Sequence, residues 1–158
     1  MKNLSVYLVA ILSLGVLLVN GCTPEPTEYE LLQSATKKFR EDEFDKALDE
    51  FHLFLKKFPR SQNAPEALYA MAVIYANKKK EYSKAESVYT KLAMDYPDHA
   101  TAPSAAYQRA LIFAQHLKKP DSAIVAYEYF LKRYPATLSA SAARSELNEL
   151  RKPAKPSK

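Results

Sequence analysis

Glycine is almost absent from this chain of 158 residues: its two glycines, Gly15 and Gly21, both precede Cys22. A body without glycine cannot form a phosphate-cradling glycine-rich loop, a dinucleotide-binding fingerprint or the usual two-residue β-hairpin turns. Cysteine occurs once, at Cys22, so an internal disulfide is impossible. These absences exclude glycine-loop nucleotide-binding folds and disulfide-stapled scaffolds.

The patterns that mark most catalytic and metal sites are also missing. The chain contains no GxSxG, HExxH or thiol–imidazole arrangement. Its three histidines, His52, His99 and His116, do not have the spacing of metal ligands. We therefore expect a protein that is not an enzyme, with no catalytic residues, no metal, no cofactor and no small-molecule substrate.

The excess of positive charge is confined to the two ends of the chain. The formal net charge is +5 at pH 7, but Lys2 and four cations in residues 151–158 account for it. Residues 22–150 carry 18 basic and 18 acidic side chains. A nucleic-acid-binding domain needs a basic face on its folded body, so we expect no nucleic-acid partner. The proline-broken basic tail, residues 152–158, is expected to be disordered.

What the chain does contain is typical of helices. Alanine, leucine, lysine and glutamate, all strong helix formers, dominate residues 22–158. The ten prolines lie between candidate helices or in their first turns, where a missing N–H group costs little. The composition therefore predicts an all-α body.

A sequence repeat with a fixed period occupies most of the chain. The pairs Phe58-Pro59, Tyr96-Pro97 and Tyr134-Pro135 mark the 38-residue period. Three further sets follow it: Ala47, Ala85 and Ala123; Phe51, Tyr89 and Tyr127; and Phe54, Leu92 and Phe130. A fixed period of this length indicates stacked supersecondary units that cannot bury their apolar faces alone. Such stacks usually bind other molecules rather than catalyse reactions.

Each repeat is expected to form two antiparallel helices. Apolar residues at three- and four-residue steps, with prolines in first turns, place first helices near 28–40, 64–77 and 102–116 and second helices near 44–58, 82–96 and 120–134. A last helix near 139–151 is polar on its outer side and is expected to cap the stack. The repeats then span about residues 28–63, 64–101 and 102–138.

Residues 1–22 resemble a bacterial lipoprotein signal. Lys2 precedes an uncharged apolar run over residues 4–19, shorter than the ~20 residues that cross a bilayer comfortably. Val19-Asn20-Gly21-Cys22 then resembles the lipobox, with Asn20 in place of the usual small residue. The resemblance implies a signal peptide over residues 1–21 and lipidation of Cys22. Because Thr23 rather than aspartate follows the cysteine, the resemblance also implies sorting to the outer membrane. The alternative to a cleaved lipoprotein signal is an uncleaved signal anchor with an incidental cysteine.

The linker between the lipidated cysteine and the first helix, residues 22–27, is short and contains two prolines. A diacylglyceryl group supplies two acyl chains, which anchor a protein stably where one chain does not. The few residues after the cysteine reach at most ~17 Å. The folded body is therefore expected to sit close to the membrane surface.

The repeat resembles the tetratricopeptide repeat over residues 28–151. That family's pattern is a large residue, then Leu-Gly-x-x-Tyr, then Ala, an aromatic residue, Ala and Pro. The second repeat matches it at Leu68, Met71-Ala72, Tyr75, Ala85, Tyr89, Leu92 and Pro97, and the third at Ala106, Arg109-Ala110, Phe113, Ala123, Tyr127, Phe130 and Pro135. The resemblance implies an α-solenoid of three helix pairs with a C-terminal capping helix. Family units have about 34 residues; one extra residue here lies between Tyr75 and Ala85, and three lie after Pro97.

In tetratricopeptide proteins, extended or helical peptides bind a concave groove lined by the first helices. Such a surface here would be aromatic and amphipathic, suited to stacking on a peptide while its amides bond the peptide backbone. Several of these side chains have an equally good reading as inter-repeat core, and Tyr69 and Tyr107 are the best candidates for partner contact. The set lacks the Lys/Asn/Arg clamp with which some relatives hold a C-terminal carboxylate. By position, the implied groove residues are Tyr29, Leu32, Thr36, Tyr69, Val73, Asn77, Tyr107, Leu111 and Gln115.

An exported, lipidated array of this type resembles the BamD-type (YfiO-type) lipoproteins, which serve β-barrel assembly in the outer membrane. The resemblance implies a non-catalytic scaffold on the periplasmic face of that membrane. Its partners would be barrel-assembly subunits or unfolded barrel proteins. Those lipoproteins usually have five repeats, whereas three and a cap are present here. The alternatives are a Tol-Pal-associated, cell-division-linked protein, whose three-repeat module is very similar, and another lipoprotein that docks an envelope complex.

Overall fold

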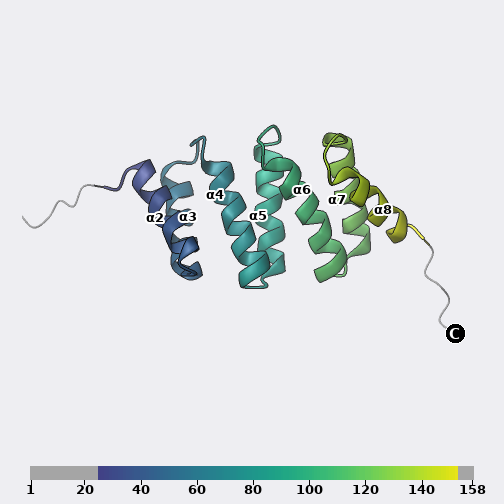
Figure 1. Cartoon of the computed structure of the whole chain (residues 1–158), viewed down its shortest axis with the longest axis horizontal. Helices are drawn as coiled ribbons and strands as arrows, with labels where there is room; N and C mark the ends of the chain where they lie inside the picture. Colours follow the sequence, from purple (N-terminus) through teal and green to yellow (C-terminus); the bar gives the residue numbers. More distant parts are fainter. Residues whose placement is uncertain (1–24, 153–158) are drawn as a thin grey trace, which may run out of the picture.

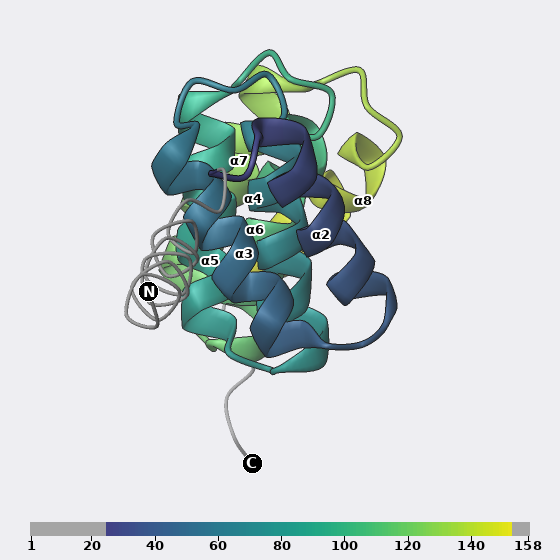
Figure 2. The same cartoon turned by 90° about the vertical axis from the view of Figure 1, so that its left-hand side faces the viewer.

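The computed structural model describes residues 25–152, which form a stack of antiparallel helices with no strand among them (Figure 1). Seen along the stack, the helix pairs lie one behind another (Figure 2). Two of the first helices continue into π-helical turns, η2 (Ile74–Lys78) after α4 and η3 (Ile112–His116) after α6. The predicted all-α solenoid of three helix pairs and a closing helix is confirmed. The α-helices are α2 (Glu28–Arg40), α3 (Phe44–Lys57), α4 (Ala64–Val73), α5 (Tyr82–Asp95), α6 (Ala102–Leu111), α7 (Pro120–Arg133) and α8 (Ala140–Leu150).

Local sequence signals set where the helices begin. Thr27 caps α2 with a reciprocal pair of bonds: its hydroxyl accepts from the Glu30 N–H at 3.3 Å, and the Glu30 carboxylate accepts from the Thr27 N–H at 2.9 Å. Pro65, Pro103 and Pro120 lie in the first turns of α4, α6 and α7. At those positions the missing N–H group would have no partner within the helix. The observed helix starts therefore follow from the sequence.

This repeat is longer than the tetratricopeptide unit, and the π-helical turn of the repeat accommodates one of the extra residues. In η2 the N–H of Lys79 donates to the carbonyl of Ile74 at 3.0 Å, and in η3 the N–H of Leu117 donates to Ile112 at 2.9 Å. A bond that reaches back five residues rather than four accommodates an inserted residue within a helix. The sequence places an extra residue ahead of the second helix of the repeat. The structure accommodates it in the last turn of the first helix.

The turns within the helix pairs pass through the left-handed backbone region at equivalent positions. These residues are Asp42 (φ 59°), Lys80 (φ 58°) and Lys118 (φ 53°). Glycine adopts this region at the lowest cost, but the sequence has no glycine after Gly21. Each turn tip therefore carries a charged side chain where a glycine would relax the backbone.

The recurring Tyr-Pro pair joins consecutive repeats by a hydrogen bond. The hydroxyl of Tyr134 donates to the carbonyl of Pro97 at 2.8 Å, and that of Tyr96 donates to the carbonyl of Pro59 at 3.3 Å. Burial raises the pKa of Tyr134 to about 12, which extends to more alkaline pH the range over which its hydroxyl can donate. Phe58, the equivalent residue of the first repeat, has no hydroxyl, which fits a position with no preceding repeat in the described chain.

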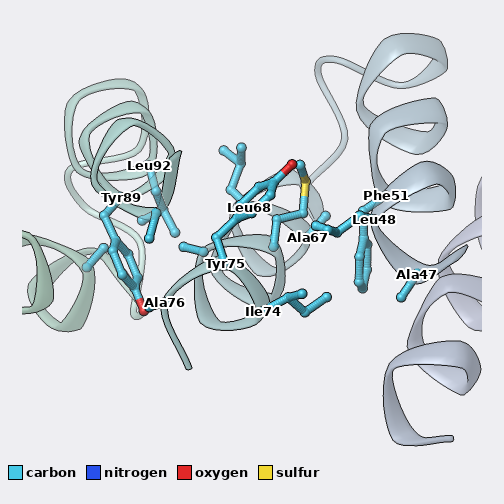
Figure 3. Close-up of a cluster of buried hydrophobic side chains, with 14 of the residues drawn as sticks. Ala47, Leu48, Phe51, Ala67, Leu68, Ile74, Tyr75, Ala76, Tyr89 and Leu92 are labelled. Carbon is cyan, nitrogen blue, oxygen red and sulfur yellow. The ribbon is translucent and has the colours of Figure 1, made fainter. Parts of the chain in front are cut away.

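The core combines small and large side chains at repeated positions. Ala47, Ala85 and Ala123 have no exposed surface, and one turn further along each second helix lies a buried ring, that of Phe51, Tyr89 or Tyr127. The alanines let the paired helices approach closely, and the rings fill the space beside them. Figure 3 shows part of this core, including Phe51, Leu68 and Tyr89.

Helix α8 ends the described stack with a polar outer side. It buries Ala140, Ala143 and Leu147. Arg144 and Asn148 are exposed, although they hold the positions of two buried alanines of α6. A further helix packed on that side would have to bury the Arg144 charge, which is costly without a partner. We interpret α8 as the cap that the sequence predicts.

Candidate partner-binding groove

The nine groove residues implied by the tetratricopeptide resemblance all lie on α2, on α4 with η2, or on α6 with η3, which we call the first-helix face. The structure leaves each of them at least partly accessible to solvent. They differ in their surroundings. The three of the first repeat surround a hollow, and the two central tyrosines pack on core rings. Val73 and Leu111 are half-buried, and Asn77 and Gln115 lie in the π-helical turns.

The residues of the first repeat gather around a hollow of about 280 Å³ on α2. Tyr29, Leu32 and Thr36, all implied by the resemblance, line it together with Gln33 and Arg40. Tyr29 is 68% exposed, so its ring is available to stack on a partner. The hollow combines an apolar floor with amide and guanidinium donors, which suits a peptide segment.

Two of these side chains are already engaged within α2. The amide of Gln33 donates to the hydroxyl of Tyr29, and the hydroxyl of Thr36 donates to the carbonyl of Leu32 at 2.7 Å. The first contact holds the Tyr29 ring against its own helix. The second uses the hydroxyl proton of Thr36, so this residue offers a partner its methyl group and an accepting oxygen rather than a free donor.

Tyr69 and Tyr107 occupy equivalent positions and have a structural role in addition to any contact with a partner. The ring of Tyr69 lies edge-on to Tyr89 with centroids 5.9 Å apart. The ring of Tyr107 lies 6.2 Å from Tyr127 and 5.4 Å from Phe130. Both tyrosines are half-buried. They therefore join the first helix to the second in each repeat while remaining partly accessible to solvent.

The remaining groove residues follow the first-helix face toward the turns. Val73 and Leu111 are half-buried, whereas Asn77 and Gln115 are exposed and belong to η2 and η3. Tyr69, Val73 and Asn77 are four residues apart, a spacing that places side chains on one side of a helix only if the helix is α-helical throughout. A π-helical turn changes the rotation per residue, so Asn77 and Gln115 do not continue the stripe in α-helical register.

Several features of this face were missed by the sequence analysis. Gln33 and Arg40 line the hollow, and their spacing from Tyr29 (four and eleven residues) is the helical signal that could have found them. Further along the stack, an ion pair joins Arg109 to Glu86 at 2.9 Å and is about one-fifth exposed. Thr90 also donates to Glu86 at 2.7 Å. The sequence carries no signal for this pair, because its members come from different repeats.

Metal clusters and membrane spans are both absent from the described part of the chain. Among residues 25–152, no group of three or more His, Cys, Asp or Glu side chains is placed to hold a metal ion. In the same segment, none of the helices combines the length and the apolar character needed to cross a bilayer.

Antiparallel helix pairs that repeat at a fixed period around small, buried alanines define a tetratricopeptide-type helical-repeat protein, a class of protein-interaction scaffolds that is generally non-catalytic. The chain belongs to the YfiO family of outer membrane lipoproteins, since the model of that family matches residues 24–153. Membership associates the chain with the outer membrane. Comparison with curated proteins gives no significant match.

Solved structures agree with the fold. A tetratricopeptide repeat protein from Parabacteroides merdae aligns with a TM-score of 0.64 and 21% identity, over 82% of this chain and 47% of that one. The first tetratricopeptide domain of Spaghetti (RPAP3), bound to the HSP90 peptide SRMEEVD, aligns with a TM-score of 0.58 and 21% identity, over 78% of this chain and 89% of that one. A MamA RS-1 double mutant aligns with a TM-score of 0.60 and 20% identity, over 78% of this chain and 65% of that one. The chain thus spans less than two-thirds of two of these three structures.

Proposed function

We propose that this chain is a lipid-anchored, non-catalytic scaffold on the periplasmic face of the outer membrane that takes part in the assembly of β-barrel membrane proteins. The observation that carries the proposal is the match to the YfiO family over residues 24–153, which includes every described helix. The lipobox-like sequence that ends at Cys22 supports the anchor. Cys22 itself lies outside the described residues.

The proposed mechanism is capture of a protein segment on the first-helix face. The hollow on α2 offers an exposed aromatic ring, an apolar floor and the Arg40 guanidinium. Half-buried Tyr69 and Tyr107 extend this surface along the stack. The Spaghetti domain, which shares the fold, is a structure with a bound peptide, and this supports peptide binding by the same architecture here. The expected partners are barrel-assembly subunits or unfolded barrel proteins.

The lipid anchor is tested by Cys22→Ser in the full-length protein. Serine cannot form the thioether to the diacylglyceryl group, and the remaining apolar segment, residues 4–19, is short for a membrane span. We expect the variant to move from the membrane fraction to the soluble fraction, measured by fractionation and by mass spectrometry of the N-terminal peptide. A variant that stays in the membrane would show that the segment is an uncleaved anchor.

The groove is tested by in-cell photo-crosslinking. A benzoylphenylalanine in place of Tyr29 keeps an exposed aromatic group on the first-helix face, and the control places it at Leu138, which is fully exposed in the loop before α8. We expect crosslinks to a barrel-assembly subunit or a barrel protein from position 29 and not from position 138. Crosslinks from position 29 to Tol-Pal components would assign the alternative role. Equal crosslinking from both positions would remove the groove from the mechanism.

A further inference from the structure

The two junctions between consecutive repeats use equivalent positions, but ion pairs join the turns only in the first. In the first junction Lys79 pairs with Asp45 at 2.6 Å, and Lys78 lies 3.9 Å from Asp42. Pairing with Asp45 raises the pKa of Lys79. Lys78 also lies over the ring of Phe44, with its Nζ 5.0 Å from the centroid. The turn of the first repeat thus supplies two carboxylates to the turn of the second.

The second junction keeps the aromatic contact but has neither the two carboxylates nor the two lysines of the first, because His116 and Leu117 stand at the positions of Lys78 and Lys79. His116 stacks on Tyr82 with ring centroids 3.9 Å apart and 5° between planes, in place of Lys78 on Phe44. At the positions of Asp42 and Asp45 stand Lys80 and Ser83. The junction that lacks the ion pairs is also hollowed. A space of about 460 Å³ lies there, lined by Lys80, Glu81, Tyr82, Ser83, Lys84 and Leu117.

The surface around this hollow carries uncompensated positive charge. We call residues 78–84 and 116–121 the basic edge; it holds six lysines and two acidic residues, Glu81 and Asp121. Three of the lysines, Lys78, Lys79 and Lys84, pair with Asp42, Asp45 and Glu81. Lys80, Lys118 and Lys119 are exposed and take part in none of the ion pairs among residues 25–152. Residues 22–150 as a whole are neutral, so this edge is a local concentration of charge. Complementary charge raises the rate and specificity of association with an acidic partner.

We propose that the hollow of the second junction binds an acidic segment of a partner protein. The carboxylates of such a segment would pair with Lys80, Lys118 and Lys119, which are exposed and have no ionic partner among residues 25–152. The apolar wall of Tyr82 and Leu117 gives the segment a surface on which to pack. The basic edge is therefore a second interaction surface, separate from the first-helix face.

The position of the basic edge favours a protein partner over the membrane. The chain enters α2 at Glu28 and reaches the turns at the opposite end of that helix, after 13 residues or roughly 20 Å (Figure 1). If the proposed anchor at Cys22 holds the entry end near the membrane, the turns point away from it. This step rests on the proposed function, whereas the assignment of an acidic ligand does not.

The test measures binding of fluorescein-labelled hexaglutamate to the full-length protein in neutral phosphatidylcholine nanodiscs, by fluorescence anisotropy. The junction variant, Lys80→Asp with Ser83→Asp, transfers the acidic pair of the first turn to the second. Folding is not at risk, because Asp42 already occupies the equivalent left-handed position. The control, Lys132→Asp with Ser141→Asp, makes the same charge change at exposed positions at the other end of the helices.

We expect saturable binding that weakens by roughly tenfold or more in the junction variant and stays within about twofold in the control at physiological salt. Absence of saturable binding, or equal losses in both variants, would overturn the proposal. Loss of binding when phosphatidylglycerol replaces part of the neutral lipid would assign the edge to the membrane instead. None of these outcomes depends on crosslinking from Tyr29, so the proposed function and this inference can fail independently.

Discussion

Phe130→Ala is expected to lower the free energy of unfolding by about 3–5 kcal/mol. Phe130 has no exposed surface, and its ring lies 5.4 Å from Tyr107 and 6.1 Å from Tyr134. Alanine would leave a cavity where the first helix, the second helix and the end of the third repeat meet. We expect a lower midpoint in urea and a melting temperature lower by roughly 10–20 °C, measured by far-UV circular dichroism.

The matched control for this prediction is Leu138→Ala. Leu138 is fully exposed, so its removal is expected to change the unfolding free energy by no more than about 0.5 kcal/mol. Phe54, the equivalent of Phe130 in the first repeat, is also fully buried. Since repeats in a solenoid are stabilised by their neighbours, Phe54→Ala should destabilise to a similar degree. A mild effect of Phe130→Ala would mean that this ring is not the packing centre of its repeat.

The helix bounds were predictable from the sequence because the signals that set them are local and repeated. When η2 and η3 are counted with the helices that they continue, first-turn prolines and the 38-residue period place every helix to within one residue of its observed limits. The all-alanine positions Ala47, Ala85 and Ala123 were likewise recognisable, since only small side chains let paired helices approach closely. The fold follows from features that recur three times, and each recurrence strengthens the others.

The details that the sequence did not predict depend on which residue occupies a repeated position. The extra residue of each unit was located before the second helix, but nothing in the sequence says that a π-helical turn rather than a loop absorbs it. The sequence likewise does not show that Asp45 pairs with Lys79 of the next repeat. Lys78-Lys79-Lys80 and Glu41-Asp42-Glu43 are visible as charged turns, but the sequence does not show that Lys78 pairs with Asp42 of the neighbouring repeat.

The candidate groove was predictable only in outline. Positional correspondence placed all nine residues on the first-helix face. It could not separate Tyr29, which is exposed beside a hollow, from Tyr69 and Tyr107, whose rings also hold the repeat together. A substitution of Tyr69 or Tyr107 would therefore mix loss of packing with loss of binding. For this reason Tyr29 is the better position for a functional probe.

Ala123→Leu is expected to destabilise the protein by about 1–3 kcal/mol or more, although leucine forms helices almost as well as alanine. Ala123 has no exposed surface and belongs to the same buried cluster as Ala110 of the facing first helix. A leucine there cannot be accommodated without moving α7 away from α6. The expected result is a lower midpoint in urea, again followed by far-UV circular dichroism.

The control for this prediction is Ala142→Leu on the exposed side of α8. It makes the same chemical change in a helix where there is room for it, and we expect a change within about 0.5 kcal/mol. If both variants lost stability equally, helix propensity rather than close approach would explain the effect. If neither did, the alanine shared by all three repeats would not be what sets the spacing of each helix pair. A loss confined to Ala123→Leu would make that close approach the reason why alanine recurs at this position in every repeat.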